Sequence, residues 1–585
     1  MIRKDPHDPG SPSPERTPAS LPVNRTRRRK RVGVIELLAY TVSSEWLSLK
    51  LVNSLKRQYY SIMPQVVSVW CRELGHDVTY ATYYGQADPL SLLPDDLDVV
   101  FISASTQASA LAYALAKLYR RKGVLTVAGG PHAKCFPADC RRFFDLTVTQ
   151  CDRDLIDDIL SGRIDPPAIV ASSQPLQSFP AIEERLPEIR AAAFDGPLPN
   201  RTSVISLFGS VGCPYTCNFC TDWNSTYVPL PSDQLASDLK FASRRFPGAW
   251  LGFQDPNFGV RFDETMEVFD AIPERRRNPY LMQCSLAILS EARMTKLANT
   301  RCRYLAPGVE SWSDYGNKLK MTSTRGQDRV AGIASKFSML RRFVPGLQAN
   351  FVFGLDIDVG SDPFDLTREF IAKVPFVWPN LNIITPYGGT PVYDDMVRGG
   401  RLLRGMPLAL YCSPYLALTP RNYDPIEFYD RLIDLLSAST STILTAKRFL
   451  TADHVALKIA RLAQTSAVRH DIREMRRIRA ELQHDPALRA FHDGRAAGLP
   501  SFYSRHLDQR LGRYAELLTP AERVPVHANA SAEATPPRGE AGVDAPRKPA
   551  GATKPGPDTS GPRGASKSQP GNQFLSNAAN VYPRL

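Results

Sequence analysis

The 585-residue sequence has no apolar run approaching the roughly 18–20 residues that a membrane-spanning helix needs, so we expect no integral membrane span. The N-terminus is polar and proline-rich, and we expect no secretory signal there. Cysteine is scarce, with 10 residues, and three of them are spaced too closely for a disulfide framework. This usage is typical of a reducing, cytoplasmic setting and of metal chemistry. With 43% hydrophobic residues, the chain is not wholly disordered.

An evenly basic surface is also missing, although the net charge is +13. Residues 1–31 carry +6 and residues 521–585 carry +3, so the long stretch between them carries only +4. The basic run 27–31 could contact nucleic acid or an anionic surface, or it could be a solvated, disordered arm. We favour the arm because such arms are common, and we do not expect a nucleic-acid partner.

Strands and helices alternate through most of the chain, which predicts an α/β protein. Residues 1–30 and 521–585, rich in Pro, Ser and Gly, are predicted to be disordered. Residues 31–158 alternate strand and helix, which predicts a doubly wound, Rossmann-like parallel sheet. In such sheets ligands bind at the carboxyl ends of the strands, so the loops after Ser103 and Ala128 are candidates for a binding site.

The alternation resumes in a second region. Residues 159–202 are proline-rich and irregular, which predicts a linker. Between 203 and 400 six expected strands fit a partial (β/α)6 barrel: 203–208, 250–253, 280–285, 304–309, 347–355 and 381–385. Residues 401–520 are predicted to form a helical C-terminal region. Its helices could cover the barrel mouth or pack on its side.

Three cysteines carry the clearest chemical signal. Cys213, Cys217 and Cys220 spell C-x3-C-x2-C in a loop after the first barrel strand. Three thiolates at this spacing can hold three irons of a 4Fe–4S cluster and leave the fourth iron open for another ligand. The alternatives are a zinc site with a distant fourth ligand or a set of buried cysteines. No nearby Cys or His pair completes a zinc tetrahedron, so we favour the cluster.

The triad, with an aromatic residue before its last cysteine, resembles that of the radical S-adenosylmethionine (SAM) enzymes. In that family the open iron binds SAM, and reductive cleavage gives a 5′-deoxyadenosyl radical. Later segments resemble the family's SAM-binding motifs in the expected order. They imply SAM contacts from Phe219, Asp255, Asn257, Glu310 and Phe353, and the turn 385–391 resembles that of relatives with a cobalamin domain.

The sheet at 31–158 resembles the cobalamin-binding domain that precedes the barrel in one large subfamily. The resemblance implies cobalamin contacts from Ser103, Thr106, Gly129, Gly130, Pro131 and His132. We do not expect His132 to bind cobalt; we expect it to satisfy backbone groups of its loop. The D-x-H-x-x-G pattern at 5–10 lacks the strand, loop and helix of a cobalt-binding motif and is read as coincidence. The subfamily's Gly-Glu-x-Glu segment is replaced here by residues 149–154.

The resemblance implies an enzyme with a 4Fe–4S cluster, SAM and cobalamin. We expect a methyltransferase that carries a SAM-derived methyl group on methylcobalamin to an unactivated carbon. The alternatives are a radical cyclase, oxidase or rearrangement enzyme without methyl transfer, and a non-catalytic cobalamin- or nucleic-acid-binding regulator. Expected partners are a small-molecule or lipid-like substrate and an electron donor such as flavodoxin or ferredoxin. Trp312 and Tyr315 could line the substrate pocket, although core packing is the more common role of such aromatics.

Overall fold

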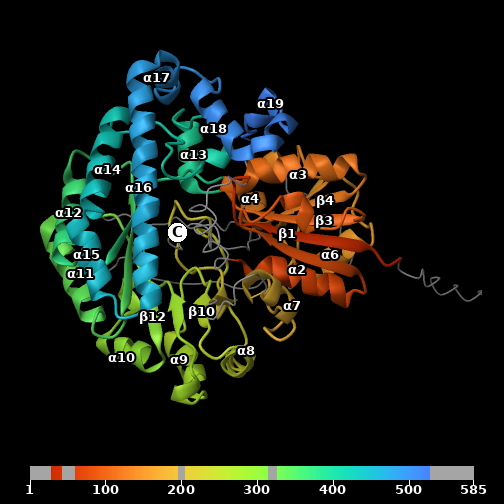
Figure 1. Ribbon diagram of the computed structural model, residues 1–585, viewed down its shortest axis with the longest axis horizontal. Helices are drawn as coiled ribbons and strands as arrows, with labels where there is room; N and C mark the ends of the chain where they lie inside the picture. The colour runs from red at the N-terminus through yellow and green to blue at the C-terminus, as the bar shows by residue number, and fades with distance from the viewer. Residues whose placement is uncertain (1–27, 43–59, 195–203, 314–325, 528–585) are drawn as a thin grey trace, which may run out of the picture.

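The computed structural model describes residues 28–42, 60–194, 204–313 and 326–527 (Figure 1). The pattern at 5–10, Tyr315 and most of the two predicted disordered segments lie outside the described residues. The predicted C-terminal tail begins too early, because helix α19 (Pro520–Arg523) is formed and the Val526 amide donates to Asp139 Oδ1 at 2.9 Å. Within the described residues, no helix has both the length and the apolar character that crossing a membrane requires.

The N-terminal unit is a parallel six-stranded sheet in the order β2-β1-β3-β4-β5-β6. The chain order reverses between β1 and β3, the kind of position at which open α/β sheets bind ligands. Along β1, Val32 and Val34 face one side of the sheet, while Ile35 and Leu37 face the other, which buries both faces. The strands are β1 (Arg31–Leu37), β2 (Asp77–Tyr83), β3 (Val99–Ala104), β4 (Leu125–Gly129), β5 (Leu146–Gln150) and β6 (Ala168–Ala171).

Helices cover both faces of this sheet, as the alternation predicts. Helix α3 lies on one face, and α2 and α6 lie on the other (Figure 1). The doubly wound fold is therefore confirmed. The helices are α2 (Ile62–Glu73), α3 (Ser109–Arg121), α4 (Gly130–Cys135), α5 (Pro137–Cys140) and α6 (Arg153–Leu160), with short helical turns η2 (Pro89–Leu92) and η3 (Thr106–Ala108).

The predicted linker 159–202 is not irregular throughout. Strand β6 pairs with β5 and adds a sixth strand to the sheet, with Thr147 opposite Ile169. Its four residues follow two prolines, which hid the strand in the sequence. After it come α7 (Leu186–Ile189) and η4 (Arg190–Phe194), and the fully buried Arg185 donates to Gln65 Oε1 on α2 at 2.9 Å. This segment therefore packs firmly on the N-terminal unit.

The second unit is an open parallel barrel sheet in the order β7-β10-β11-β12-β14-β13, with β15 also paired to β14. The expected strand 304–309 is divided into β12 and β13, and both halves pair with β14. The strands are β7 (Val204–Leu207), β10 (Trp250–Phe253), β11 (Tyr280–Met282), β12 (Cys302–Leu305), β13 (Gly308–Glu310), β14 (Gly346–Phe353) and β15 (Trp378–Ile383).

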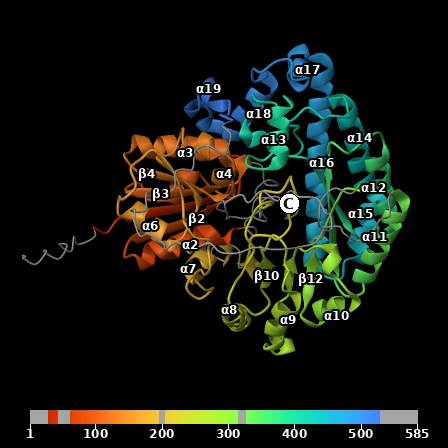
Figure 2. The same ribbon diagram turned by 180° about the vertical axis from the view of Figure 1, so that it is seen from behind.

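Helices line the outside of the barrel sheet, so the partial barrel is confirmed (Figure 2). They are α8 (Ser232–Arg245), α9 (Phe262–Asp270), α10 (Glu291–Asn299), α11 (Gly326–Leu340), α12 (Asp362–Lys373) and α13 (Pro391–Arg398), with short turns η5 (Glu274–Arg276) and η6 (Leu286–Ile288). A two-stranded antiparallel ribbon, β8 (Ser210–Val211) with β9 (Val228–Pro229), encloses the loop that carries the three cysteines.

The C-terminal region is helical, as expected. Its elements are η8 (Leu408–Leu410), α14 (Pro425–Ser439), α15 (Thr442–Thr451), α16 (Val455–His484), α17 (Pro486–His492), α18 (Ser501–Leu511), η9 (Gly512–Leu517) and α19. Phe502 and Tyr503 join the barrel core, whereas Leu507, Leu511 and Leu518 join the core of the N-terminal unit. The region therefore packs on the side of the barrel and bridges the two units.

Candidate functional site

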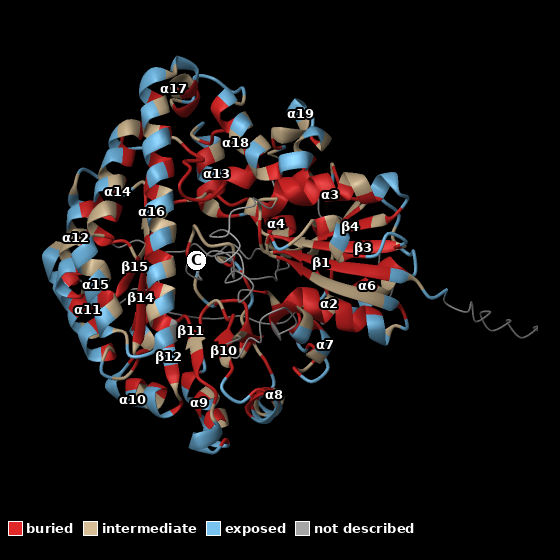
Figure 3. Ribbon diagram, in the orientation of Figure 1, coloured by how far each residue is buried: buried red, intermediate tan, exposed pale blue. Residues whose placement is uncertain are grey.

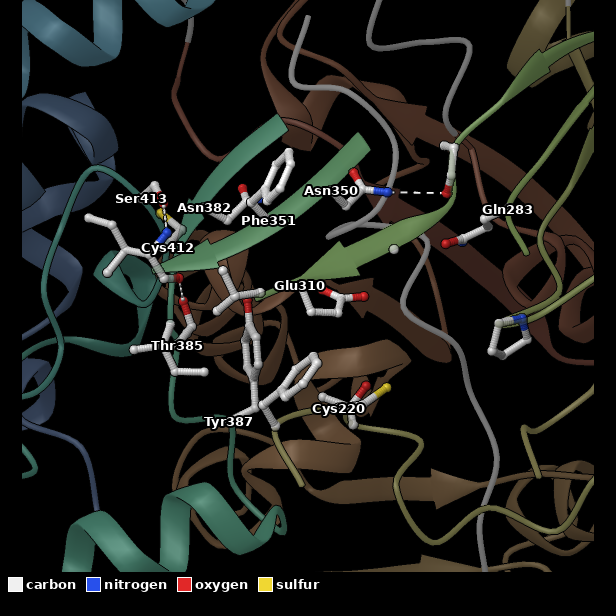
Figure 4. A pocket seen from close by; sticks show the side chains of 18 of the residues that line it. Cys220, Gln283, Glu310, Asn350, Phe351, Asn382, Thr385, Tyr387, Cys412 and Ser413 are labelled. Atoms are coloured by element: carbon white, nitrogen blue, oxygen red, sulfur yellow. Dashed lines mark hydrogen bonds between the residues drawn. The ribbon is translucent and has the colours of Figure 1, made fainter. Parts of the chain in front are cut away.

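A pocket opens at the carboxyl ends of the barrel strands, beside the cysteine loop (Figure 4). It encloses about 1130 Å³, its solvent-open mouth included. Its lining combines apolar side chains with neutral polar groups, and Glu310 is the one charged residue among the described residues that line it. The lining residues are Phe219, Cys220, Thr221, Pro256, Gln283, Cys284, Ala306, Gly308, Glu310, Asn350, Phe351, Val352, Asn382, Ile383, Ile384, Thr385, Tyr387, Cys412 and Ser413.

The cysteine loop has a fixed entry. Gly212 has φ +72°, and a Cβ there would overlap the carbonyl oxygen of Thr226 across the loop. The Cys213 amide donates to Ser225 Oγ at 3.1 Å, and the Cys220 amide donates to the Cys217 carbonyl at 3.0 Å. The glycine and the bond from Cys213 to Ser225 draw the two ends of the loop together, and the bond from Cys220 to Cys217 closes a turn inside it.

The three cysteines of the loop differ in exposure, and their side chains do not converge on one point. Cys213 and Cys217 are buried, while Cys220 is partly exposed and lines the pocket. Among the described residues no three Cys, His, Asp or Glu side chains converge as the ligands of one metal ion would. In a 4Fe–4S cluster each thiolate binds a different iron, so the sulfurs need not converge on one point. The ten cysteines form no disulfide.

A buried ion pair connects the cysteine loop to the N-terminal unit. Lys134 Nζ on α4 lies 2.9 Å from Asp222 Oδ1, two residues after Cys220, and the side chains are 14% and 3% exposed. Burial alone would lower the pKa of Lys134, but the Asp222 carboxylate outweighs it and raises the pKa. The ammonium group therefore stays charged beside the loop.

A glycine turn strengthens the same junction. A Cβ on Gly388 would overlap the carbonyl oxygen of Cys135, at the end of α4. The Trp223 indole donates to the Gly389 carbonyl at 2.6 Å, and the Val392 amide donates to the Asn218 carbonyl at 3.2 Å. The turn 385–391 thus binds the cysteine loop on one side and touches the N-terminal unit on the other. The close approach to Cys135 requires glycine at 388, and a φ of +76° favours it at 389.

Glu310 is placed on the pocket wall by a strained backbone. Its φ is +63°, a conformation that a residue with a side chain rarely adopts outside special sites. A Cβ on Gly308 would overlap the Glu310 carboxylate, so the side chain folds back over the glycine. Glu310 and Phe219 line one pocket with Cys220.

Two other expected SAM residues hold backbone instead of lining the pocket. Asp255 is buried; it accepts from Ser210 Oγ at 2.6 Å and from the Gly209 amide at 3.0 Å, and burial raises its pKa to about 6. Asn257 Oδ1 accepts from the Ser285 amide at 2.9 Å. Asp255 therefore fixes the entry to the cysteine loop, and Asn257 fixes the end of β11. Pro256, between them, is the member of this segment that lines the pocket.

Phe353 and Trp312 face the core. The Phe353 ring stacks on Phe364 of α12 with centroids 5.2 Å apart, and it does not line the pocket. Its neighbour Val352 does, because successive side chains of a strand point to opposite faces. Trp312 Nε1 donates to Thr367 Oγ1 at 2.8 Å, so the core interpretation of this tryptophan is the correct one.

Sequence reasoning missed the amides of the pocket. Asn350 accepts from Gln348 at 2.7 Å and from Asn380 at 2.9 Å, and it donates to the Ala306 carbonyl at 3.1 Å. These bonds fix its orientation on the pocket wall. Gln283 and Asn382 also line the pocket. Two amide residues inside the buried strand β14, Gln348 and Asn350, were a signal, because buried amides need partners.

On the N-terminal unit, the expected cobalamin residues gather at the carboxyl ends of β3 and β4. Gly130 has φ +85°, and a Cβ there would lie 2.7 Å from Ser103 Oγ, so only glycine fits. A Cβ on Gly129 would meet open space. Thr106 begins η3, which touches η8 of the C-terminal region, and Pro131 opens α4. This edge of the sheet faces the barrel (Figure 1).

His132 has a different partner from the one expected. Its Nε2 lies 2.6 Å from the Tyr113 hydroxyl, which donates to Asp139 Oδ2 at 2.7 Å. The Tyr113 hydroxyl uses its one hydrogen to donate to Asp139, so towards His132 it can only accept. The Nε2 of His132 therefore carries a hydrogen and donates to the Tyr113 hydroxyl. Burial lowers the pKa of His132 to about 4, so the ring is neutral at pH 7. A side-chain relay, rather than loop backbone, therefore holds this histidine.

No protein-family model matches the chain. It is 24% identical over 360 residues to a bacteriochlorophyllide d C-8(2)-methyltransferase of Chlorobaculum tepidum, covering 58% of this chain and 76% of that protein. It is 25% identical over 236 residues to the hopanoid C-3 methylase of Methylococcus capsulatus, covering 39% and 42%. Among solved structures, the radical SAM methyltransferase TsrM of Kitasatospora setae, with cobalamin and a [4Fe–4S] cluster bound, aligns with a TM-score of 0.49 at 12% identity over 77% of this chain and 99% of that one.

The sequence relatives, the order of the two units and the cysteine loop agree with one another. A doubly wound sheet precedes an open barrel, and the C-x3-C-x2-C loop follows the barrel's first strand. The curated relatives are methyltransferases. These findings agree with the resemblance to radical SAM enzymes that carry a cobalamin-binding type of N-terminal domain.

Proposed function

We propose that this enzyme methylates a carbon atom of a small or lipid-like molecule, using a 4Fe–4S cluster, SAM and cobalamin. When bound, these groups would supply a 5′-deoxyadenosyl radical to activate the substrate and a SAM-derived methyl group to transfer. The observation that carries the proposal is that Cys220, Phe219 and Glu310 line one pocket, and that α4 of the cobalamin-type unit is ion-paired to the same loop.

The proposed role of each residue follows from its place in the pocket or beside the cysteine loop. Cys213, Cys217 and Cys220 would hold the cluster, and Glu310 would accept hydrogen bonds from SAM hydroxyl or amino groups at the pocket wall. Asp255 and Asn257 would act as positioning residues, because they bond the backbone at the base of the loop and the end of β11. Phe353 would stabilise β14 through its stack on α12.

Cobalamin would bind along the edge of the N-terminal sheet that faces the barrel, against Ser103, Thr106, Gly129, Gly130 and Pro131. Open space above Gly129 supports this, because a bulky ligand needs close access to backbone. His132 would hold this loop through Tyr113 and would not bind cobalt. The same edge contacts the barrel through Lys134, so both cofactors would face one cavity.

The pocket suits an uncharged substrate. Its described lining includes Gln283, Asn350 and Asn382, and among the described residues no lysine, arginine or histidine lines it. Carboxamides both donate and accept, so they can orient carbonyl or hydroxyl groups without requiring charge. A flavodoxin or ferredoxin would supply the electron, and the cytoplasm is the compartment that keeps such thiolates reduced.

The proposal is tested by anaerobic reconstitution with iron, sulfide and cobalamin. We expect about four irons and one corrinoid per chain. Incubation with SAM carrying a deuterated methyl group should then yield both S-adenosylhomocysteine and 5′-deoxyadenosine. Production of 5′-deoxyadenosine without S-adenosylhomocysteine would favour the cyclase, oxidase or rearrangement class. Neither cofactor bound would favour a non-catalytic binding protein.

A matched pair of variants separates the cluster from general stability. Cys220→Ala should lose bound iron and 5′-deoxyadenosine formation, because one corner of the cluster loses its ligand. Cys151→Ala removes a thiol that is also buried but packs in the N-terminal unit, and it should retain the iron. Equal iron in both variants would contradict the assignment of the triad.

A further inference from the structure

Helices α15 and α16 expose an unusual number of large apolar side chains. Ten such residues are more than about one-third exposed in the described chain, and five of them fall between positions 443 and 462. These five are Ile443 (69%), Leu450 (75%), Val455 (67%), Ile459 (52%) and Leu462 (49%). Single exposed apolar residues are ordinary, but a concentration on one helical hairpin indicates an interaction surface.

The five residues lie on outward faces of two adjacent helices. Val455, Ile459 and Leu462 are spaced by four and three residues, which places them on one face of α16. Ile443 and Leu450 are seven residues apart and share one face of α15. The helices pack against each other, and α16 runs along the outside of the molecule with an exposed face (Figure 3). We call these five residues the apolar patch.

The same stripe of α16 continues as a row of arginines. Arg469, Arg473 and Arg476 follow Leu462 in the same spacing, by way of the exposed Ser466, and all three are exposed. Within the described residues none of the three guanidinium groups lies within ion-pair distance of a carboxylate, although Arg469 donates to the Thr440 carbonyl at 3.0 Å. We call them the arginine row. By contrast, the exposed Arg477 of the same helix pairs with Glu474, and the half-buried Arg479 pairs with Asp430.

Hydroxyl groups surround the arginine row. A groove beside it is lined by all three arginines together with Leu462, Ile472 and five hydroxyl residues, Ser437, Thr440, Thr445, Thr465 and Ser466. Guanidinium and hydroxyl groups are good donors to phosphate oxygens. An apolar region that continues into a phosphate-binding region is the pattern of a surface that lies on a membrane.

We propose that the α15–α16 hairpin docks this enzyme on an anionic phospholipid bilayer. The apolar patch enters the boundary of the acyl chains, and the arginine row binds the head-group phosphates. The stripe from Val455 to Arg476 runs about 30 Å along one helix, so the helix lies flat on the surface. This goes beyond the proposed chemistry and does not depend on it.

A bilayer fits better than a protein partner for two reasons. The patch is wholly aliphatic, whereas binding hot spots between proteins are enriched in tryptophan and tyrosine as well as arginine. No described carboxylate forms an ion pair with the arginine row, so its three positive charges are available to lipid phosphates.

The experiment is flotation of the full chain with vesicles of three parts phosphatidylcholine to one part phosphatidylglycerol. Wild-type protein should float with these vesicles and not with pure phosphatidylcholine. A triple variant, Arg469→Gln with Arg473→Gln and Arg476→Gln, should bind roughly 100-fold more weakly, since each basic residue contributes about a 5-fold factor. A second variant, Leu450→Ser with Val455→Ser and Ile459→Ser, should also lose binding. All six positions are exposed, so both variants should fold.

The matched control removes three exposed arginines elsewhere, Arg244→Gln with Arg275→Gln and Arg276→Gln, and should float like the wild type. Equal flotation of the arginine-row variant would overturn the proposal and assign binding to the basic run 27–31. No flotation of the wild type would also overturn it. In that case, self-association abolished by the serine variant would identify a second copy as the occupant, and capture of an acidic protein abolished by the glutamine variant would identify a protein partner.

Discussion

Glu310 shows how one residue can be placed at a cost to the backbone. A side-chain-bearing residue with φ near +60° costs on the order of 1–3 kcal/mol, and such strain persists where the surrounding structure enforces it. Here the carboxylate lies over Gly308, on the wall that Cys220 shares. The glycine thus provides room for the carboxylate rather than a special turn, because its own φ is not positive.

Gly308→Ala tests this placement. The added methyl should push the Glu310 carboxylate aside while the fold survives, because a flexible side chain can move. We expect SAM affinity to fall by roughly 10- to 100-fold, the value of one or two hydrogen bonds to a charged group. Calorimetric titration with SAM measures it. Gly332→Ala, where a Cβ meets open space on α11, is the control and should bind normally. Unchanged SAM affinity in Gly308→Ala would show that Glu310 does not contact SAM.

Glu36 on β1 predicts a pH dependence of stability. Burial raises its pKa from 4.5 to about 8, although the hydrogen bond that Oε1 accepts from the Ser61 amide opposes the shift. The folded chain therefore holds a proton that the unfolded chain releases between these values. Its stabilising contribution is complete below the unfolded pKa and is lost as pH rises through about 8.

Glu36→Gln keeps the neutral form at every pH. Relative to the wild type, the variant should gain stability on the order of 3 kcal/mol between about pH 5 and about pH 8. Thermal unfolding across this range measures the difference. Glu73→Gln, an exposed position on α2, should show no such trend. A constant difference between Glu36→Gln and wild type would contradict the protonated state.

At the scale of elements, the cysteine loop and α4 form one assembly. The Lys134–Asp222 pair, the contact of Gly388 with Cys135 and the bond from Trp223 to Gly389 all lie at this junction. Residues of both units thus fix the cysteine loop, so the N-terminal unit also determines the geometry of that loop.

Lys134→Met should test the junction. It leaves the Asp222 carboxylate buried without this partner, and breaking a buried pair costs about 3–5 kcal/mol. We expect a lower melting temperature and less iron retained on reconstitution. The double variant Lys134→Met with Asp222→Leu should recover stability, because no charge is then left buried. Lys122→Met breaks an exposed pair with Asp95 and should cost under about 1 kcal/mol. If Lys134→Met behaves like Lys122→Met, the pair is not structural.

At the scale of the whole molecule, the C-terminal region joins the two units. Leu507, Leu511 and Leu518 pack in the N-terminal core, and Lys117 on α3 pairs with Glu522 at 2.7 Å. The chain therefore returns to its first domain after completing the barrel. These contacts of the C-terminal region hold the carboxyl ends of the N-terminal sheet's strands towards the barrel opening.

Leu511→Ala should weaken the packing of the C-terminal region on the N-terminal unit. A buried leucine truncated to alanine costs about 2–5 kcal/mol through lost burial and the cavity left behind. In calorimetry the thermal transition of the N-terminal unit should move to lower temperature. Leu450→Ala, at an exposed leucine, is the stability control and should move it little. A similar effect of both substitutions would argue that α18 does not support the first domain.

Local patterns in the sequence determined much of this protein. The spacing of Cys213, Cys217 and Cys220 predicts a cluster-binding loop, and the alternation of strands and helices predicts both parallel sheets and their order along the chain. These features depend on neighbours along the chain, through the period of an element or the closure of a short loop, so sequence alone can reveal them. Strand β6 was not predicted, because four residues after two prolines are too few to show the alternation of a strand.

Only the tertiary structure decided which side chains meet. It paired Lys134 with Asp222, turned Phe353 to the core and Val352 to the pocket, and assigned Asp255 to the backbone of the loop entry. Each outcome depends on the packing of segments far apart in the chain. Hydrophobic burial and hydrogen bonding select among many such pairings, and no local period encodes the result.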